Sequence, residues 1–543
     1  MTEPWTPADH STGQQGLRRQ VARGLTWTFV HTWGGQLLSL VVFLVLARLL
    51  TPGEFGLVAY AALFVGLAQI VIDQGFGDAL IQRPSVTRSQ IDTAFWVAVA
   101  TGAVLTVIGI VFAGPLAALL TVKEPASAPR LTPIIQALSL LFIISSFSST
   151  QQALLRRELA FRSLATRGLL SLAGGGAVGI VLAFLNFGPW ALVAQQLAAA
   201  AISVVTLWTI SPWRPGLQLS RRDFGELFNF GIKIVGTDFL GFLSRNSDNF
   251  LVGIFLGEVA LGLYAVAYRI LDTTEKVLVS VSRRLAFPAL AKLQREPERM
   301  AKAYLTLTRI GGSAILPGYV GLALVAPELT VVMFGPQWAK AGLVSSVLFL
   351  IGPVVAMQAF SGSLFTAAGH PSVVFRFRFL VTVTNIIGFI LAVQVGKDIL
   401  WVAFAFALRG YLLLPLNLSW QRKYGGVATS EYLAQFRGSG IGTLLMIAMV
   451  LLVKFGVGPH VGTTLLLLLE VVAGAATFVV ALWIFDRRLL LEMWRITRQS
   501  IPGLGRLSRS VSGRMNRSAD ADLADATSET KAEPLSPSVR GEK

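Results

Sequence analysis

Residues 251–267 read "LVGIFLGEVALGLYAVA", two apolar runs joined by a short Gly-Glu break. Beyond this stretch each run continues to about 18 to 25 residues, the length that a helix needs to cross a hydrocarbon core of about 30 Å. Similar runs recur along the chain from Gly24 to Phe485. The pattern predicts an all-α polytopic membrane protein.

The number of these runs predicts about fourteen transmembrane helices. We expect them near 24–49, 55–80, 93–120, 131–154, 165–185, 189–210, 228–256, 259–282, 303–326, 341–366, 373–395, 399–420, 437–456 and 461–485. The composition agrees, because 54% of the 543 residues are hydrophobic and only 14% are charged. A soluble domain has about 25% charged residues.

The distribution of basic residues predicts the orientation in the membrane. Alternate segments, including both termini, hold 36 of the 46 Lys and Arg, and the loops of the opposite side hold six. Cytoplasmic loops carry the excess of Lys and Arg, so both termini are expected to be cytoplasmic. The net charge of +17 is then a topological signal and predicts no nucleic acid partner.

A weak internal repeat divides the chain into two halves. "LARLLTPGEFGLVAYA" at 46–61 is similar to residues 251–267, with Gly56 matching Gly262. Six predicted spans separate the copies, so the halves keep one orientation and form parallel repeats. We expect a cytoplasmic tail (1–23), an N-lobe of helices 1–6 (24–210), a cytoplasmic linker (211–227), a C-lobe of helices 7–12 (228–420), two further helices 13–14 (437–485) and a largely disordered cytoplasmic tail (486–543).

Three stretches resemble a known family. They are residues 46–83, "TAFWVAVATG" at 93–102 and "FGIKIVGTDFLGFLSRNSDNFLVGIFLGEVALGLYAVAYRIL" at 230–271. Together they resemble the Wzx-type polysaccharide flippases, in particular the colanic-acid exporter branch of the multidrug, oligosaccharidyl-lipid and polysaccharide exporter superfamily. The resemblance implies two six-helix lobes around a central cavity in a bacterial cell membrane. It also implies translocation of undecaprenyl-diphosphate-linked oligosaccharide units from the cytoplasmic to the outer leaflet by alternating access.

Predicted span 7 carries the richest set of polar residues. Asp238, Arg245, Asp248 and Asn249 are spaced by three, four and seven residues, which places them on one helical face. Ionisable groups in a bilayer cost several kcal/mol unless they are paired or hydrated, so this face should line the cavity. Arg245 would hold an anionic phosphate or acidic sugar, and Asn246 and Asn249 would bind sugar hydroxyls. The structural alternative is a fixed ion pair between Arg245 and Asp248.

Predicted span 8 has a second polar face made by Tyr268, Arg269, Asp272, Glu275 and Lys276. Arg269 lies about ten residues into the span, deep enough for contact with an anionic substrate. Tyr268 would line the cavity beside it. Lys276 is closer to the cytoplasmic interface, which it can reach by extending its side chain.

The energy source must be a gradient or product consumption, because the sequence has no Walker motif. The candidates for proton or sodium coupling are Asp73, Asp238, Asp248, Asp272 and Glu275. Asp73 could equally cap a neighbouring loop. No cofactor, metal site or catalytic group is expected, since the chain has no cysteine and its four histidines are scattered.

Two other transporter activities and two other classes of protein remain as alternatives. An ion-coupled multidrug exporter or a lipid II flippase would share the architecture, although Arg245 and Arg269 favour an anionic substrate over cationic drugs. A membrane scaffold would not need charges inside two spans, and a sugar polymerase or glycosyltransferase would need larger loops. The expected partners are the lipid-linked oligosaccharide, membrane lipids, and a polysaccharide polymerase and glycosyltransferases.

Overall fold

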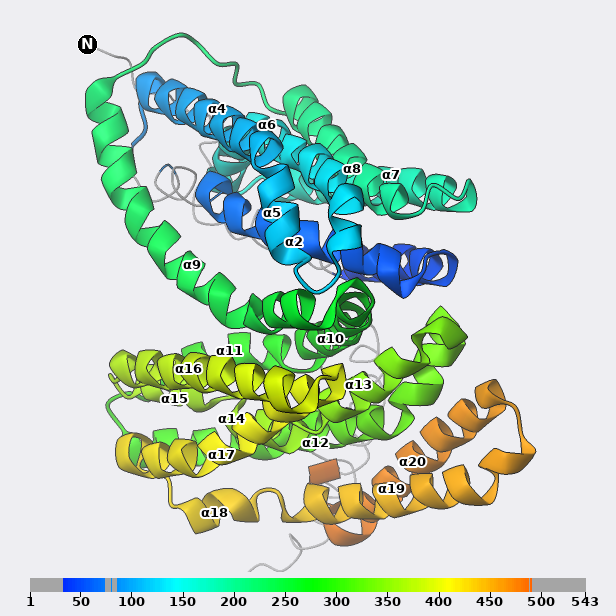
Figure 1. Cartoon of the computed structure of the whole chain (residues 1–543). Coiled ribbons are helices and arrows are strands. Elements are labelled where there is room, and N and C mark those ends of the chain that lie inside the picture. Colours follow the sequence, from blue (N-terminus) through cyan, green and yellow to red (C-terminus); the bar gives the residue numbers. More distant parts are fainter. Residues whose placement is uncertain (1–32, 74–79, 81–84, 488, 491–543) are drawn as a thin grey trace, which may run out of the picture.

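The chain is helical almost throughout the part that the computed structural model describes, residues 33–73, 80, 85–487 and 489–490 (Figure 1). No β-strand occurs within these residues. In the first half the helices are Trp33–Leu49, α2 (Pro52–Asp73), α4 (Arg88–Val111), α5 (Ala113–Leu120), η1 (Pro125–Ser127), α6 (Ala128–Arg157), α7 (Phe161–Phe184) and α8 (Pro189–Ile210). Helix dominates because a backbone in hydrocarbon has to satisfy its own hydrogen bonds.

The second half is longer and its helices are more often interrupted. They are α9 (Arg221–Leu256), α10 (Glu258–Leu278), α11 (Ser280–Ala291), α12 (Pro297–Phe334), η2 (Pro336–Trp338), α13 (Ala339–Phe349), α14 (Gly352–Gln358), α15 (Ser361–Ala367), α16 (Pro371–Gly396), α17 (Ile399–Gly425), α18 (Thr429–Ala434), α19 (Arg437–Gly456), η3 (Gly458–His460) and α20 (Thr463–Phe485).

Among the described residues, ten helices are long and apolar enough to cross a membrane, or eleven if a bent pair in residues 336–367 is one span. Three further stretches that the sequence assigns to spans are also helical. Trp33–Leu49 is shorter, and α9 and α10 carry several charged residues. The multi-span membrane protein is therefore confirmed, whereas the count of fourteen is not.

Two predicted spans are interrupted helices. The predicted span 93–120 is formed by α4 and α5, with a break at Phe112. Pro115 has no N–H to donate to the carbonyl four residues earlier, which explains the break. The predicted span 341–366 is formed by α13, α14 and α15, with a bend of 41°. Pro353 stands in the first turn of α14, a position that favours the start of a new helix.

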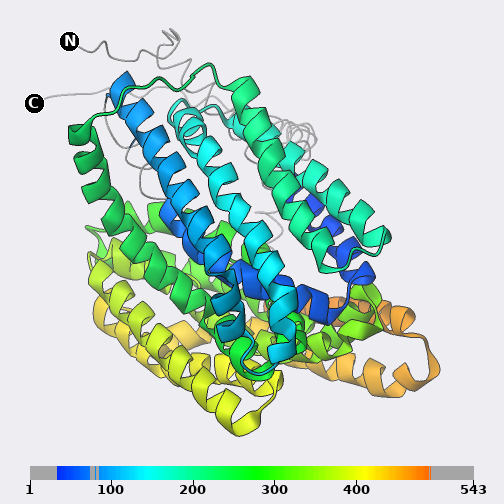
Figure 2. The same ribbon diagram turned by 45° about the horizontal axis from the view of Figure 1, so that its top comes forward.

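The helices form two groups that lie against each other (Figures 1 and 2). The first group contains the helix Trp33–Leu49, α2 and α4 to α8, and the second contains α9 to α17. α9 runs along both and packs on α2 and α4 of the first group and on α10 and α16 of the second. α19 and α20 pack on each other and on α12, at the edge of the second group (Figure 1). The sequence boundaries of an N-lobe and a C-lobe stay predictions.

The two groups meet where α2 crosses α10, and two glycines make this crossing close. A Cβ atom on Gly56 would lie 1.8 Å from the backbone oxygen of Glu258, and one on Gly262 would lie 1.8 Å from that of Pro52. Helices in a membrane approach closely through small residues, because lipid supplies no hydrophobic force between them. The internal repeat matches these two glycines, and the structure places each against the other's helix.

Hydrogen bonds strengthen this seam at the same end of the molecule. The Tyr60 hydroxyl donates to the backbone oxygen of Gly253 at 2.6 Å. Arg48 donates through Nε to the last turn of α12 at 2.9 Å. The indole N–H of Trp338 donates to the backbone oxygen of Ala47 at 2.7 Å. The end of the molecule that holds the first residues of α2 and α10 is therefore closed between the groups.

A larger side chain at the crossing is expected to separate α2 from α10, because overpacking costs about 1–3 kcal/mol. A Cβ atom on Gly53 would lie 3.7 Å from Cγ2 of Val259, so the double variant Gly53→Cys with Val259→Cys places two thiols across the crossing. The chain has no other cysteine that could form a disulfide. This pair should form a disulfide in vesicles, and adding Gly56→Leu or Gly262→Leu should abolish it. The control is Gly456→Leu, where a side chain meets open space. Undiminished cross-linking with Gly56→Leu would contradict the close contact.

Candidate functional site

The polar residues predicted in spans 7 and 8 lie in α9 and α10 at a common depth. Arg245 stands eleven residues before the end of α9 at Leu256, and Arg269 stands eleven residues after the start of α10 at Glu258. At about 1.5 Å per residue both lie about 16 Å from that end, near the middle of a core about 30 Å thick. A charged group at this depth has to be paired or reach water.

Asp248 is enclosed by the second helix group. It is 3% exposed, and the Tyr264 hydroxyl donates a hydrogen bond of 2.9 Å to its Oδ2 atom. The backbone N–H of Asn249 donates to Oδ1 at 2.8 Å. Arg409 of α17, whose guanidinium lies 5.0 Å from the ring centroid of Phe406, acts electrostatically on Asp248. This buried carboxylate is therefore balanced within its own helix group.

Arg245 is exposed, on the same side of α9 as the buried Val252. An α-helix turns about 100° per residue, so the side chains of Arg245 and Val252 point in directions that differ by about 20° when α9 is viewed along its axis. Three exposed apolar residues of α9 point about 120° to 160° away from it; they are Phe239, Leu243 and Phe250. The side chain of Arg245 therefore lies on the side of α9 opposite to these three residues, in line with the buried Val252.

In the part of the chain that the structure describes, the hydrogen bonds of Asp248 come from Tyr264 and Asn249, and no ion pair joins it to Arg245. Asn246 donates its amide to the backbone oxygen of Phe242 at 3.0 Å. The predicted common face of α9 therefore separates into a buried carboxylate and an exposed guanidinium.

Arg269 reaches across the seam between the helix groups. Its Nη2 atom donates to Ser39 Oγ at 3.0 Å, and its guanidinium lies 4.8 Å from the ring centroid of Phe43. Both partners belong to the helix Trp33–Leu49. A cavity of about 180 Å³ adjoins Arg269, lined by that helix, α10 and α12. It is smaller than the pockets of about 300–1,000 Å³ that hold drug-sized ligands, so it admits a small anionic group rather than a whole oligosaccharide.

The other predicted residues are not gathered into one site. Asp272 pairs with Lys276 one turn along α10 at 2.6 Å, and Tyr268 packs edge-on against an aromatic ring of α17 at 6.3 Å. Glu275 is exposed. Asp238 is half-buried, and its Oδ2 atom has no hydrogen bond within the part of the chain that is described. Asp73 ends α2, and its side chain lies outside the described residues.

Sequence reasoning missed a second polar cluster, which joins helices 13 and 14 to α12. Lys454 of α19 lies 2.8 Å from Glu328 of α12 and 4.0 Å from Glu470 of α20. Glu470 is the one acidic residue in "TTLLLLLEVVAGAATFVVALWIF" at 463–485. A lone acid inside an apolar span is the signal that could have identified it.

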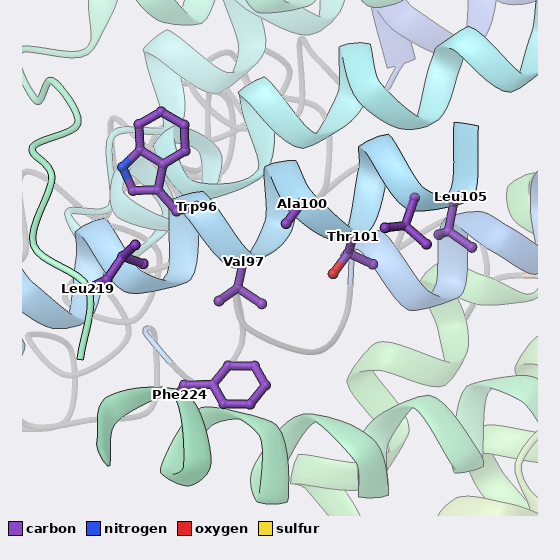
Figure 3. Close-up of a pocket in the computed structure, with 8 residues that line it drawn as sticks. Trp96, Val97, Ala100, Thr101, Leu105, Leu219 and Phe224 are labelled. Atoms are coloured by element: carbon purple, nitrogen blue, oxygen red, sulfur yellow. The ribbon is translucent and has the colours of Figure 1, made fainter. Parts of the chain in front are cut away.

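An apolar cavity of about 610 Å³ lies between α4 and the first turns of α9 (Figure 3). Val97 and Thr101 of α4 point toward Phe224 of α9 across it, and Trp96 and Leu219 lie at one end (Figure 3). Apart from the Thr101 hydroxyl and the Trp96 indole N–H, which donates to a backbone oxygen, its lining is hydrocarbon. This cavity suits a lipid chain rather than a polar headgroup.

A third cavity, of about 530 Å³, lies beside the ends of α9 and α10 at the closed end of the seam. Lys123, Lys340 and Lys397, three of the six basic residues predicted for the outer side, line it. Lys340 pairs with Asp398 at 2.7 Å. Partial burial works to raise the pKa of Asp398, but the Leu400 N–H and the Lys340 ammonium hold this pKa below its ordinary value.

Comparison of the sequence with known families and curated proteins gives a consistent result. Residues 45–342 match the profile of a family described as polysaccharide biosynthesis protein. The chain is 26% identical over 399 residues to the teichuronic acid biosynthesis protein TuaB of Bacillus subtilis, covering 72% of this chain and 80% of that protein. It is 25% identical over 370 residues to the lipopolysaccharide biosynthesis protein WzxC of Escherichia coli, covering 67% and 74%.

Solved structures share the fold at low sequence identity. The lipid II flippase MurJ in an inward closed conformation aligns with a TM-score of 0.68 and 12% identity, covering 86% of this chain and all of that one. A multidrug resistance transporter of the MATE family in an inward-facing conformation aligns with a TM-score of 0.57 and 15% identity, covering 74% and 96%. The two helix groups of this chain are therefore an arrangement that transporters use.

The Asp248–Tyr264 hydrogen bond should contribute measurably to stability. Tyr264→Phe leaves Oδ2 of a buried carboxylate without this partner, which is expected to cost about 1–3 kcal/mol. Thermal unfolding of the purified protein in detergent, followed by tryptophan fluorescence, should show a lower midpoint. Tyr268→Phe is the matched control, because the Tyr268 hydroxyl makes no hydrogen bond to the described residues. Equal midpoints for Tyr264→Phe and Tyr268→Phe would contradict the importance of this bond.

Proposed function

Because this chain belongs to the polysaccharide biosynthesis protein family, we propose that it is a flippase, a transporter rather than an enzyme, for lipid-linked oligosaccharides. Its substrate is undecaprenyl-diphosphate-linked oligosaccharide repeat units, which it moves from the cytoplasmic to the outer leaflet for cell-surface polysaccharide export. The relatives TuaB and WzxC are named for the biosynthesis of teichuronic acid and lipopolysaccharide. The MurJ-like fold supports the architecture that such transport requires.

One observation carries this proposal, the position of Arg269. Its guanidinium lies at mid-depth, at the seam between the two helix groups, beside a cavity that admits a small anionic group. The diphosphate of a lipid-linked oligosaccharide is such a group, and a guanidinium binds phosphate oxygens through paired hydrogen bonds. In the structure the Ser39 hydroxyl accepts one of these donors. The phosphate oxygens would replace this weak neutral acceptor.

The remaining polar and apolar surfaces fit the other parts of the substrate. Arg245 is exposed at about the same depth as Arg269, and would supply a second cation for the diphosphate or for an acidic sugar. Asn246, Asn249 and Tyr268 would contact sugar hydroxyls beside it. The polyprenyl chain stays in lipid or lies along apolar surface such as the cavity between α4 and α9.

Transport by alternating access requires the seam to open at one end when it closes at the other. The glycine crossing of α2 and α10 closes the end that the charge distribution assigns to the outer side. We place both termini in the cytoplasm, since 36 of the 46 basic residues would face it. A polymerase and glycosyltransferases are the partners that consume and supply the lipid-linked glycan.

Coupling to a proton or sodium gradient would drive the cycle, because the sequence has no ATP-binding motif. Among the predicted carboxylates, Asp248 is buried in the second helix group, and Asp238 has an oxygen without a hydrogen bond among the described residues. Asp272 is paired with Lys276, which makes it a weaker candidate. Asp73 and Glu275 stay candidates by their positions in the sequence.

An ion-coupled multidrug exporter is the alternative with the same fold. Cationic drugs would meet Arg245 and Arg269 at mid-depth, where the low dielectric strengthens the repulsion between like charges. The family match over residues 45–342 also favours a glycan substrate. A lipid II flippase would carry the same diphosphate and differs in the sugar.

Arg269→Ala is expected to reduce translocation of a labelled lipid-linked oligosaccharide in vesicles by at least about 10-fold, since hydrogen bonds to charged groups contribute about 1.5–3 kcal/mol. Arg245→Ala should also reduce it. Arg269→Lys keeps the charge without the paired donors, so its rate should lie between those of the wild type and Arg269→Ala.

The matched control is Arg299→Ala, because Arg299 stands in the first turn of α12 and forms an exposed ion pair with Glu296 at 2.6 Å. It should translocate at the wild-type rate. Expression and the thermal midpoint of each variant are measured alongside. Wild-type transport by a folded Arg269→Ala protein would remove the role assigned to Arg269.

A further inference from the structure

Three ionisable side chains meet between α12, α19 and α20, away from the seam. The Nζ atom of Lys454 lies 2.8 Å from Oε1 of Glu328 and donates to the backbone oxygen of Leu324 at 3.1 Å. Oε1 of Glu470 lies 4.0 Å from the same nitrogen. This Lys454 cluster, made of Glu328, Lys454 and Glu470, holds two carboxyl groups and one ammonium.

Glu470 is the most completely buried member of the Lys454 cluster. It is 0% exposed, and neither of its carboxyl oxygens has a hydrogen-bond partner within the described residues. It stands seven residues into α20, about 10 Å from the helix end. Apolar side chains of all three helices pack together here; they include Val325, Met446, Val450 and Leu467.

The charges of the Lys454 cluster do not balance if both carboxyl groups are ionised. Lys454 compensates Glu328, its closer partner, which leaves Glu470 without a counter-ion in a low dielectric. An isolated carboxylate there costs several kcal/mol, and such a group takes up a proton instead. The neutral cluster therefore contains one carboxylate, one ammonium and one carboxylic acid.

The other charged or titratable groups that the structure describes on these helices lie apart from the Lys454 cluster. His460 is exposed in the turn between α19 and α20. Arg309 of α12 pairs with Asp486 at 2.7 Å, at the opposite end of α20. Arg437 begins α19 at that same opposite end. None of these groups lies where it could neutralise Glu470.

We propose that the Lys454 cluster is a proton-binding site, in which Glu328 and Glu470 share one proton that exchanges with the outer side of the membrane. The side chain of Lys454 is 26% exposed, so water can reach the cluster from this end. A metal cation fits less well, because the ammonium already occupies the position beside the carboxylates. No three His, Cys, Asp or Glu side chains within the described ranges are placed to hold a metal ion.

α12 connects the Lys454 cluster to the seam. Leu329, which follows Glu328, lines the cavity beside Arg269 together with Met333, whose backbone oxygen accepts a hydrogen bond from the first helix group. Pro327 interrupts the hydrogen bonds of α12 next to Glu328, so this turn bends at lower cost. Loss of the proton leaves a net negative charge, which is relieved if α12 moves and admits water. Only this link to transport rests on the proposed function.

Infrared difference spectroscopy of the full-length protein in vesicles tests proton binding directly, through the carbonyl band of a carboxylic acid. Besides the bands of other buried carboxyl groups such as Asp248, the wild type should show one such group that keeps its proton at pH values above the ordinary range of a glutamic acid and loses it before about pH 10. Glu470→Gln should lack it. Glu328→Gln should lack it too, because Lys454 is then free to pair with Glu470. Lys454→Met should show two, since neither carboxyl keeps a counter-ion.

Glu298→Gln is the matched control, because Glu298 is an exposed acid in the first turn of α12. Its spectrum should equal that of the wild type. The proposal is overturned if the band survives in Glu470→Gln, or if the wild-type band persists over the whole pH range, which would indicate a permanently neutral structural group. Thermal unfolding identifies any variant that does not fold. If Glu470→Gln does not fold, the loss of the carboxylic acid band in Glu328→Gln tests the proposal instead.

Translocation assays in the same vesicles separate this site from the proposed function. Transport by the wild type should depend on the pH of the outer side, and this dependence should be lost in Glu470→Gln. If transport by Glu470→Gln depends on pH as transport by the wild type does, the Lys454 cluster has no role in transport. Absence of transport of the labelled glycan by the wild type, with the carboxylic acid band present, would overturn the proposed function and leave the proton site standing.

Discussion

Hydrocarbon cannot hydrogen-bond to a backbone or solvate a charge, and this constraint governs every part of the structure. The backbone satisfies its own hydrogen bonds by forming helix through almost the whole described chain. The side chains meet the constraint in three ways. Asp248 is buried with a tyrosine hydroxyl as donor, Lys454 is paired with Glu328, and Arg245 remains exposed. A charge that is neither paired nor hydrated would cost several kcal/mol.

The same constraint makes small residues the natural contact between the two helix groups. Gly56 and Gly262 let α2 and α10 cross with backbone against backbone, and buried apolar side chains such as Leu57 and Leu261 pack beside this contact. Packing of this kind is strong only while the surfaces match closely, because lipid replaces it without a hydrophobic penalty. A seam whose stability in the membrane depends on closely matching surfaces can open and reclose, which a transporter needs.

Polar clusters inside the second helix group have different relations to this seam. Arg269 lies on it and touches Ser39 of the opposite group, so any anion that replaces Ser39 acts on both groups at once. Asp248 lies behind it and is satisfied within one group. The Lys454 cluster lies farther away, and α12 joins it to the seam. A site on the seam can sense substrate, whereas the sites behind it can store a charge through the cycle.

Much could be deduced from the sequence alone, because hydrophobic length, charge asymmetry and residue type are local properties. They determined that the chain is a helical, multi-span membrane protein, the family that it resembles, and the charged residues worth attention in α9 and α10. The hydrogen-bond and ion-pair partners of these side chains could not be deduced, because residues on one face of a helix can contact different neighbouring helices. Arg245 and Asp248 are three residues apart in the sequence but lie in different environments. The role proposed for Glu470 depends on its position beside Glu328 and Lys454, which only the structure shows. Tertiary structure alone decided which charges are compensated, because compensation depends on distances between helices far apart in the chain.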